Sequence, residues 1–313
     1  DELTSEASYY QSTNRGKLSV ALNLASPEGQ ALVRALATDC DVLIENYKAG
    51  SLAKYGLDYA SLAELNPRLV YCSVTGFGQT GPRAAEPGYD FIVQGIGGLM
   101  SITGERDDLP GGGPQKVGVA FSDLMTGLYS TVAIQAALLS REKTGLGQHI
   151  DMALLDVQVA TLCNQSQNYL ASGKPPGRYG NAHANIVPYQ VFRASDQDFI
   201  IACGNDSQFV ALCEAIDLAH LPEDPRFTRN ADRVANREAI IEILSRHFLE
   251  GRAQAWIDRI HPRGVPIGAI NSIDQALDEP QVKARNMLVT IPHPLKADFV
   301  TVGSPIKMSG TPV

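Results

Sequence analysis

Apolar and polar positions in the first half of the chain form strand-like patterns separated by helical ones. Residues 18–24 (LSVALNL) alternate with the two-residue period of a strand, and residues 41–45 (DVLIE) and 69–75 (LVYCSVT) are apolar runs of strand length. Helical signals separate these runs. Strands separated by helices predict a parallel sheet with right-handed crossovers, so the first half indicates an α/β fold with a Rossmann-like arrangement.

The helical signals begin directly after the first predicted strand. Ser26-Pro27-Glu28 supplies an N-cap, a proline at the first helical position and an early negative charge for a helix running toward Thr38. Shorter helices are predicted at 51–55 and 61–65, and longer ones at 90–100, 123–141 and 151–172.

The second half has a different organisation. The Gly- and Pro-rich stretch 173–180 (GKPPGRYG) is typical of a connection between domains. Beyond it, a hairpin is predicted at 189–192 and 199–203, helices at 207–216, 237–248 and 253–260, and mostly extended chain from 262 onward. The predicted organisation is a large α/β domain at 1–172, a linker at 173–190, a smaller α+β domain at 191–280 and a return toward the large domain at 281–313.

Charge and composition exclude several classes of partner. The chain has 313 residues, a formal charge of -8 and a pI of about 5.3, which disfavours a nucleic-acid surface or a polybasic membrane contact. No apolar run is long enough to span a bilayer. Five cysteines are scattered without CxxC spacing, which favours reduced thiols and a cytoplasmic location.

One carboxylate stands at a position suited to chemistry. Asp123 follows the small-residue stretch Gly118-Val119-Ala120 and opens a long apolar helix. Taken locally, Asp123 or Ser122 is expected to cap this helix, because Asp and Ser are preferred there and the helix dipole favours negative charge. A carboxylate in the same place can also attack an activated acyl group as a nucleophile. The two roles are compatible.

Other chemical signatures are absent from the sequence. The histidines show no HExxH-like spacing, so no metal site is predicted. The glycine clusters at 95–98 and 111–113 lack the GK[ST] of a P-loop and the GxGxxG of a dinucleotide fold, and no GxSxG elbow occurs. No permanently bound cofactor is expected. Ligands of parallel sheets bind beyond the carboxyl ends of the strands, which points to the loops 46–48 and 76–79.

A series of motifs in a fixed order resembles one family across nearly the whole chain. The motifs are NRGKLS at 14–19, SPEG at 26–29, DVLIENY at 41–47, LNPR at 65–68, GFGQTGP at 76–82, PGYD at 87–90 and KTGLGQ at 143–148. Their order resembles class III CoA-transferases of the CaiB/BaiF type. Residues 178–183 (RYGNAH) and 186–190 (IVPYQ) are most similar to succinyl-CoA:glutarate CoA-transferases.

The resemblance implies roles for individual residues. Asp123 falls at the family's aspartate nucleophile, which forms an acyl anhydride and then an aspartyl-CoA thioester with CoA and acyl-CoA as substrates. A lysine at 54 stands where relatives carry arginine, and it would meet a phosphate as a point charge. The resemblance implies CoA contacts at Leu22, Asn23, Leu24, Ala25, Asn46, Tyr47, Lys48 and Lys54, and substrate contacts at Tyr89, Asp90, Arg178, His183, Ala184 and Asn185.

The family's architecture adds further expectations. The resemblance implies a ring-shaped subunit interlocked with a second copy in a homodimer. Family members usually open with a strand, a Gly/Pro loop and a helix that hold part of the adenine end of CoA, and this segment is expected to be absent here. A plain turn after a strand is an alternative for residues 46–48, and a buried tyrosine with a capping aspartate is an alternative for Tyr89 and Asp90.

Two other functions are compatible with the same fold. An α-methylacyl-CoA racemase needs a base on each side of the reacting carbon, and such enzymes carry histidine where this chain has Tyr89, whose unperturbed pKa of about 10 makes a poor base. A non-catalytic acyl-CoA-binding protein would have no need of Asp123. The sequence therefore favours CoA transfer from an acyl-CoA such as succinyl-CoA to a carboxylic acid such as glutarate.

Overall fold

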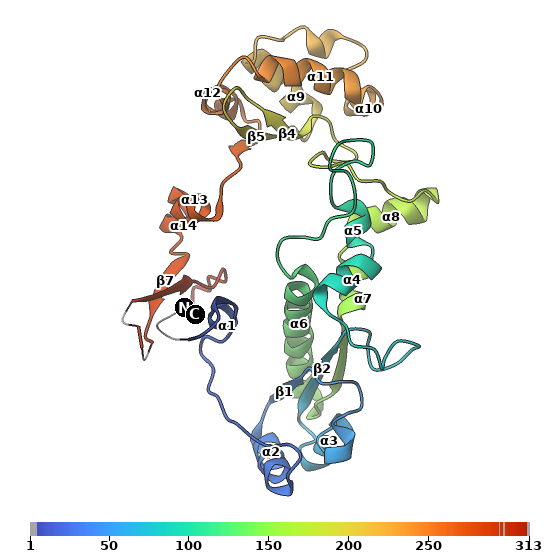
Figure 1. Ribbon diagram of the computed structural model, residues 1–313, viewed down its shortest axis with the longest axis vertical. Helices are drawn as coiled ribbons and strands as arrows, with labels where there is room; N and C mark the ends of the chain where they lie inside the picture. Colours follow the sequence, from blue (N-terminus) through green and yellow to red (C-terminus); the bar gives the residue numbers. More distant parts are fainter. Residues whose placement is uncertain (1–4, 294, 297, 312–313) are drawn as a thin grey trace. The chain divides into compact units, whose positions relative to one another are not determined.

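The computed structural model describes residues 5–293, 295–296 and 298–311, which form two compact units (Figure 1). The parallel-sheet unit comprises Ala21–Ala184. The antiparallel unit comprises the described residues of Asn185–Val313 and those up to Val20. The division falls inside the predicted linker 173–190; the finer domain limits drawn from the sequence stay a prediction.

The sheet of the first unit is parallel. It contains β1 (Val42–Glu45), β2 (Val70–Thr75) and β3 (His149–Ala153), in the order β1-β2-β3. Val42 pairs with Val70, and Tyr71 pairs with His149, both in parallel register. The predicted strands at 41–45 and 69–75 are confirmed, as is the mixed α/β class with a parallel sheet.

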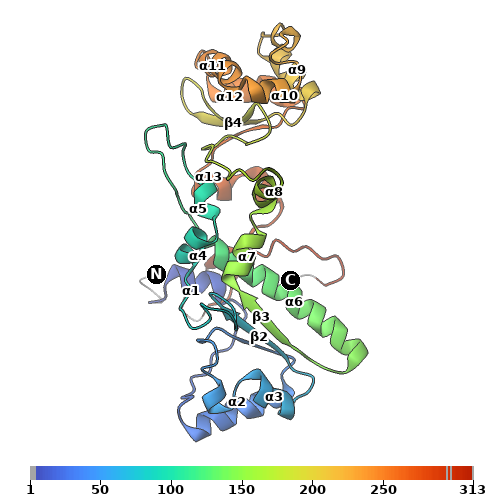
Figure 2. The ribbon, with the colours of Figure 1, turned by 90° about the vertical axis from the view of Figure 1, so that its right-hand side faces the viewer.

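Helices cover both faces of this sheet (Figure 2). On one face lie α2 (Pro27–Asp39), the 3-10 turn η1 (Ala53–Tyr55) and α3 (Tyr59–Leu65), where Leu62, Leu69 and Tyr71 share a buried cluster. The long helix α6 (Phe121–Thr144) lies on the other face. The Ser26 side chain accepts from the Gly29 N–H, so the predicted N-cap of α2 is confirmed.

Two predicted helices of this unit are interrupted. The helix expected at 90–100 ends as α4 (Asp90–Ile96) and resumes as α5 (Leu99–Ile102), because Gly98 adopts a φ of 87°. The helix expected at 151–172 is wrong in its first turn, which belongs to β3. It then divides into α7 (Leu154–Ala160) and α8 (Cys163–Ser172). The apolar run at 150–162 fits strand and helix alike, and pairing with β2 decides its first residues.

The strand expected at 18–24 does not form. Among the described residues, no strand pairs with this segment. Leu18 is fully exposed. An alternating pattern gives a strand only when neighbouring backbone accepts its hydrogen bonds, and that partner is a property of the whole fold.

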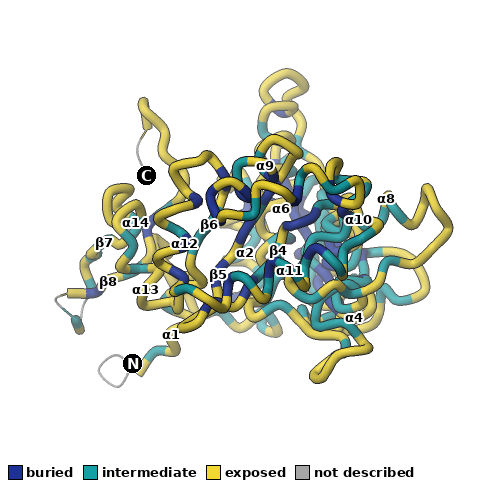
Figure 3. Tube along the Cα trace, turned by 90° about the horizontal axis from the view of Figure 1, so that it is seen from above, coloured by how far each residue is buried: buried dark blue, intermediate teal, exposed yellow. Residues whose placement is uncertain are grey.

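The antiparallel unit is built around β4 (Tyr189–Arg193), β5 (Asp198–Ala202) and β6 (Ile267–Ala269), in that order. The predicted hairpin β4–β5 is confirmed. The main core of this unit lies between these strands and α9 (Asp206–Ala215), α11 (Arg237–Phe248) and α12 (Ala253–Ile260), as the dark-blue segments of Figure 3 indicate. The predicted helices 207–216, 237–248 and 253–260 are likewise confirmed.

A fully buried arginine ties irregular chain to this core. Arg233, in α10 (Asn230–Ala235), donates to the carbonyl oxygens of Val187, Phe227 and Thr228 and pairs with Asp206 at 2.7 Å. Because guanidinium offers five donors, one side chain satisfies several buried carbonyl groups. The short 3-10 turns η2 (Leu221–Glu223) and η3 (His261–Arg263) complete the connections.

The chain after 262 is less extended than predicted. It contains α13 (Ile273–Asp278), α14 (Pro280–Ala284) and the hairpin of β7 (Leu288–Ile291) and β8 (Phe299–Val302). Ser272 and Gln275 form a capping box at the start of α13, a sequence signal that the periodicity argument overlooked. The helix α1 (Ser8–Thr13) belongs to the same unit.

Candidate active site

Asp123 lies in the first turn of α6 with its side chain exposed. The N-cap position is Ala120, which has no side-chain cap, so neither Ser122 nor Asp123 plays the expected capping role. The cap comes from another helix: the Asp90 carboxylate accepts from the backbone N–H of Ser122 at 2.7 Å and of Asp123 at 3.3 Å. The Asp123 carboxylate is therefore not needed to satisfy its own helix.

The Asp123 carboxylate borders a pocket of about 380 Å³. The ends of β1 and β2, the start of α4 and one side of α6 form its walls. A tight backbone crossing brings the start of α4 to the end of β2: a Cβ on Gly76 would lie 2.4 Å from the Cα of Gly88. The lining residues are Ile44, Asn46, Val74, Gly88, Tyr89, Asp90, Asp123, Thr126, Gly127, Ser130, Thr131, Ile134 and Leu154.

Burial and a neighbouring charge set the ionisation of Asp123. Partial burial raises the pKa of this carboxyl above its ordinary value, and the Asp90 carboxylate raises it further. Among the lining residues there is no lysine, arginine or histidine to oppose this shift. The helix dipole favours negative charge at this position, yet the pKa of Asp123 lies above its ordinary value because of desolvation and the Asp90 carboxylate, so the N-terminus does not leave Asp123 more readily ionised. A more basic carboxylate is a better nucleophile once it has ionised.

The comparisons with known proteins agree with one another. The family model of CoA-transferase family III matches residues 2–313. A succinate--glutarate CoA-transferase of Agrobacterium fabrum is 50% identical over 98% of this chain and 76% of its own length. The human succinyl-CoA:glutarate CoA-transferase is 40% identical over 97% of this chain and 68% of its own. The chain belongs to CoA-transferase family III.

A solved structure supports the same conclusion. A CaiB/BaiF family protein from Brucella suis superposes with a TM-score of 0.84 at 48% identity, covering 98% of this chain and 79% of that one. The resemblance recognised in the sequence is confirmed, and CoA transfer is the activity of the family to which this transferase belongs.

The CoA-binding residues implied by the resemblance occupy different places. Asn46 lines the Asp123 pocket, and its amide donates to the Val74 carbonyl at the end of β2. Tyr47 is exposed, with its backbone N–H donating to the Glu45 carboxylate. The Lys54 ammonium lies 4.7 Å from the centre of the Tyr55 ring. Residues 22–25 precede α2 and do not line the Asp123 pocket.

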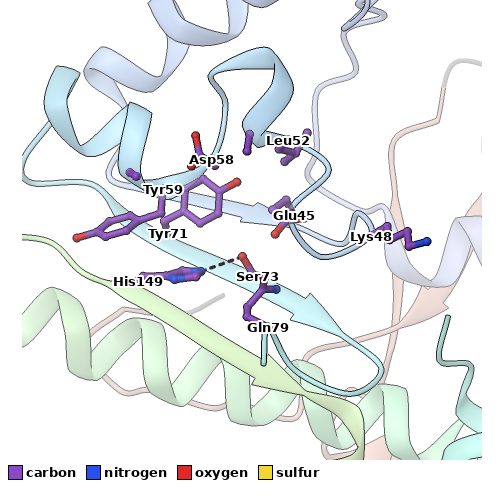
Figure 4. A pocket seen from close by; sticks show the side chains of 12 residues that line it. Glu45, Lys48, Leu52, Asp58, Tyr59, Tyr71, Ser73, Gln79 and His149 are labelled. Carbon is purple, nitrogen blue, oxygen red and sulfur yellow. Dashed lines mark hydrogen bonds between the residues drawn. The ribbon is translucent and has the colours of Figure 1, made fainter. Parts of the chain in front are cut away.

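Lys48 belongs to a second pocket, of about 270 Å³, bordered by the strand face that carries α3 (Figure 4). There the His149 ring stacks on Tyr59 at 5.2 Å and its Nε2 lies 3.0 Å from the Ser73 hydroxyl. The Lys48 ammonium points away from these rings. The lining residues are Glu45, Lys48, Gly50, Leu52, Ala53, Asp58, Tyr59, Ala60, Tyr71, Ser73, Gln79 and His149.

The substrate-binding residues implied by the resemblance also lie in different places, and only two of them line the Asp123 pocket. Tyr89 and Asp90 line the Asp123 pocket, and the Tyr89 side chain is 74% exposed. The Arg178 guanidinium donates to the Ser101 carbonyl and pairs with the Asp107 carboxylate, so its charge is already compensated. His183 and Ala184 end the parallel-sheet unit.

Asn185 begins the antiparallel unit and is held there by α10. The Asn230 amide donates to the Asn185 carbonyl, and the Asn230 side-chain oxygen accepts from the Val187 N–H. Together with Arg233, these bonds fix the chain directly after the implied substrate contacts at 183–185.

Sequence reasoning overlooked the buried amides around Asp123. Gln94 and Gln158 are both fully buried, in α4 and α7. Gln94 donates to the Asp90 carboxylate at 2.7 Å, and Gln158 accepts from the Ser122 hydroxyl at 2.7 Å. The available signal was a single glutamine within each of two apolar helical runs, DFIVQGI and LLDVQVA, because a buried amide requires partners.

Within the described ranges, no group of three or more His, Cys, Asp or Glu side chains is arranged to hold a metal ion. No helix in this part of the chain has the length and apolarity to cross a membrane.

Proposed function

We propose that this transferase uses Asp123 as a covalent nucleophile. The observation that carries the proposal is the exposed Asp123 carboxylate in the first turn of α6, bordering a pocket and relieved of capping by Asp90. A family III transferase has to hold CoA between its release from the donor acid and its transfer to the acceptor acid, and a basic carboxylate at a pocket wall can carry it as a thioester.

The proposed reaction balances at each step. Asp123 attacks the thioester carbonyl of the donor acyl-CoA, the C–S bond breaks, and CoA leaves as thiolate. The thiolate attacks the Asp123 carbonyl of the mixed anhydride, which releases the donor acid and leaves an aspartyl-CoA thioester. The acceptor carboxylate attacks this thioester and expels the thiolate, which then attacks the acceptor carbonyl of the new anhydride and restores free Asp123.

The proposed substrates are dicarboxylic acids. The relatives named for succinate or succinyl-CoA and glutarate support succinyl-CoA as donor and glutarate as acceptor. Arg178 and His183 are the proposed partners of the distal carboxylate, and Arg178 would exchange Asp107 for it. The proposed CoA contacts are Leu22, Asn23, Leu24, Ala25, Asn46, Tyr47, Lys48 and Lys54, with Tyr89, Ala184 and Asn185 beside the acyl group.

The proposed assembly is a homodimer of interlocked, ring-shaped subunits. An exposed apolar stripe on α6, formed by Leu124, Leu128, Val132 and Leu139, supports an assembly that buries it. Light scattering that gave the mass of one chain would contradict the dimer. A cytoplasmic location, the absence of a permanent cofactor and the absence of nucleic-acid or membrane partners complete the proposal.

Trapping the intermediate tests the nucleophile. Hydroxylamine added during turnover of succinyl-CoA with glutarate should convert Asp123 to a hydroxamate that mass spectrometry locates. Asp123→Ala should lower kcat by at least about 10³-fold, because the covalent route is lost. Asp39→Ala, at the exposed end of α2, is the matched control and should transfer normally. Normal transfer by Asp123→Ala would refute the proposal.

A further inference from the structure

Asp90 makes hydrogen bonds that a cap residue ordinarily makes within its own helix. One carboxylate oxygen, Oδ1, accepts from the backbone N–H groups of Ser122 and Asp123, although Asp90 belongs to α4 and these groups belong to α6. The first N–H groups of a helix have no partner inside it, so an external acceptor holds the start of the helix in place. Here that start carries the proposed nucleophile.

The second carboxylate oxygen of Asp90 is also engaged. Oδ2 accepts from the Gln94 amide nitrogen at 2.7 Å, and the Gln94 amide oxygen accepts from the Val117 N–H at 2.9 Å. Gln94 is fully buried, so both ends of its amide need a partner. This arrangement fixes the direction of the amide, and it ties the segment before α6 to the same carboxylate.

A third contact, from α7, also holds the start of α6. The buried Ser122 hydroxyl donates to Gln158 of α7, and the Gln158 amide nitrogen donates to the Thr161 hydroxyl at 3.2 Å. Residues of α4 and α7 therefore both bind the turn from which the Asp123 side chain projects. Such support fixes the backbone from which the Asp123 carboxylate projects.

We propose that Asp90 is a positioning residue for Asp123 and not a ligand of the substrate. It fixes the first turn of α6 through its hydrogen bonds, and its charge adjusts the reactivity of Asp123. The proposal rests on the proposed function of Asp123 as nucleophile. It replaces the substrate contact that the family resemblance implied for Asp90, because a substrate carboxylate would meet a like charge that is already bonded.

Asp90 is also the principal charge facing Asp123. Around the pocket, β1 contributes Ile44, β2 contributes Val74 and α7 contributes Leu154, none of which titrates. Besides Asp90, α4 and the residue before it bring one titratable group, the Tyr89 phenol. Moving the negative charge away from position 90 should therefore lower the pKa of Asp123, provided that the hydrogen bonds survive.

A pair of variants separates hydrogen bonding from charge. Asp90→Asn keeps an acceptor for α6 but turns its amide nitrogen toward the Gln94 amide nitrogen, so two donors face each other. The double variant Asp90→Asn with Gln94→Glu restores the pattern: the asparagine nitrogen donates to the glutamate, which still accepts from the Val117 N–H. The negative charge then lies on residue 94, which contacts residue 90, and no longer on residue 90 itself, so it is farther from Asp123.

The readout is kcat and KM for the acyl-CoA donor as a function of pH. Asp90→Asn should lower kcat by about 10- to 100-fold with little change in KM, since misplacing a reacting group has that cost. The double variant should recover most of this loss, and the acidic limb of its kcat/KM profile should lie at lower pH than in the wild type. Asp156→Asn, an exposed acidic residue in the first turn of α7, is the matched control.

The outcomes distinguish this proposal from the proposed function. A raised KM with unchanged kcat would make Asp90 a substrate ligand. If the kcat of the double variant is no higher than that of Asp90→Asn, the hydrogen-bond pattern does not position Asp123. If the acidic limb of the kcat/KM profile does not move, the charge of Asp90 does not adjust the reactivity of Asp123. Should Asp90→Asn fail to fold, the double variant alone, compared with wild type for kcat and pH profile, still decides. Asp123→Ala is measured in parallel, and full activity there would refute the nucleophile itself.

Discussion

The antiparallel unit and the surroundings of Asp123 bury different kinds of side chain. In the antiparallel unit the core contains Phe192, Phe199 and Phe248, whose ring centres lie 5.1 to 6.4 Å apart. Around Asp123 the buried side chains include Gln94, Ser122, Thr126, Ser130 and Gln158. Apolar burial stabilises without direction, whereas buried amides and hydroxyls have to be oriented. The difference indicates that the first region provides stability and the second provides geometry.

The largest expected effect is on stability, in the aromatic core. Phe199→Ala removes a ring with no exposed surface and should lower the free energy of unfolding by about 3–5 kcal/mol. The chain has one tryptophan, Trp256, which lies in the same core, so its fluorescence during urea unfolding reports this region. Phe91→Ala, at a side chain 57% exposed in α4, is the matched control. Equal losses in the two variants would show that the core is not the main source of stability.

An intermediate effect is expected from the buried amides. Gln158→Leu leaves the Ser122 hydroxyl without its acceptor and should cost about 1–3 kcal/mol, measured by circular dichroism during urea unfolding. Adding Ser122→Ala should recover much of this loss, because both members of the hydrogen bond are then apolar. The urea midpoint of the Trp256 fluorescence should be the same in Gln158→Leu as in the wild type if the core of the antiparallel unit unfolds independently of the surroundings of Asp123. A double variant as unstable as the sum of the single ones would contradict the pairing.

The smallest expected effect comes from the charge of Asp123. The pKa of Asp123 is raised in the folded protein, so the folded protein binds this proton more tightly than the unfolded chain does. The free energy of unfolding therefore falls as the pH rises from the ordinary carboxyl pKa of about 3.9 through the pKa of Asp123 in the folded protein. Asp123→Asn should therefore be more stable than wild type at pH 7, by less than about 1 kcal/mol because solvent screens the exposed carboxylate, and equal to it at acidic pH.

A control of opposite sign accompanies this measurement. The Ala253 N–H donates to Asp196 and lowers the pKa of that carboxyl, so Asp196→Asn should be less stable than wild type at neutral pH. Thermal midpoints across the pH range measure both differences. A pH-independent gain for Asp123→Asn would show that packing, and not charge, is responsible.

Local signals predicted the elements that depend on local physics. The N-cap at Ser26 and the apolar runs of β1 and β2 are visible in the sequence because capping and burial act within a few residues. The segment 18–24 and the start of β3 were misjudged, since a strand exists only where another strand pairs with it. Periodicity has no access to that partner.

The candidate site shows the same limit. The resemblance to a family located Asp123, whereas local reasoning placed it no better than a helix cap. The actual cap, Asp90, is more than thirty residues away in sequence and reaches α6 only because α4 folds beside it. Gln94 and Gln158 were detectable as polar residues in apolar runs, but their partners were not.

The crossing of Gly76 and Gly88 has a consequence for how this protein tolerates change. Residues 77–87 form a loop whose two ends are held together by the close contact of the Gly76 and Gly88 backbones. Exposed positions such as Thr80 and Gly81 lie in this loop, away from that contact. Extra residues, a tag or a reporter inserted there should alter the tip without displacing the base. A methyl group on either glycine would act at the base and shift Tyr89 and Asp90. The loop 77–87 should therefore tolerate insertions at its tip, whereas Gly76 and Gly88 at its base should not tolerate substitution.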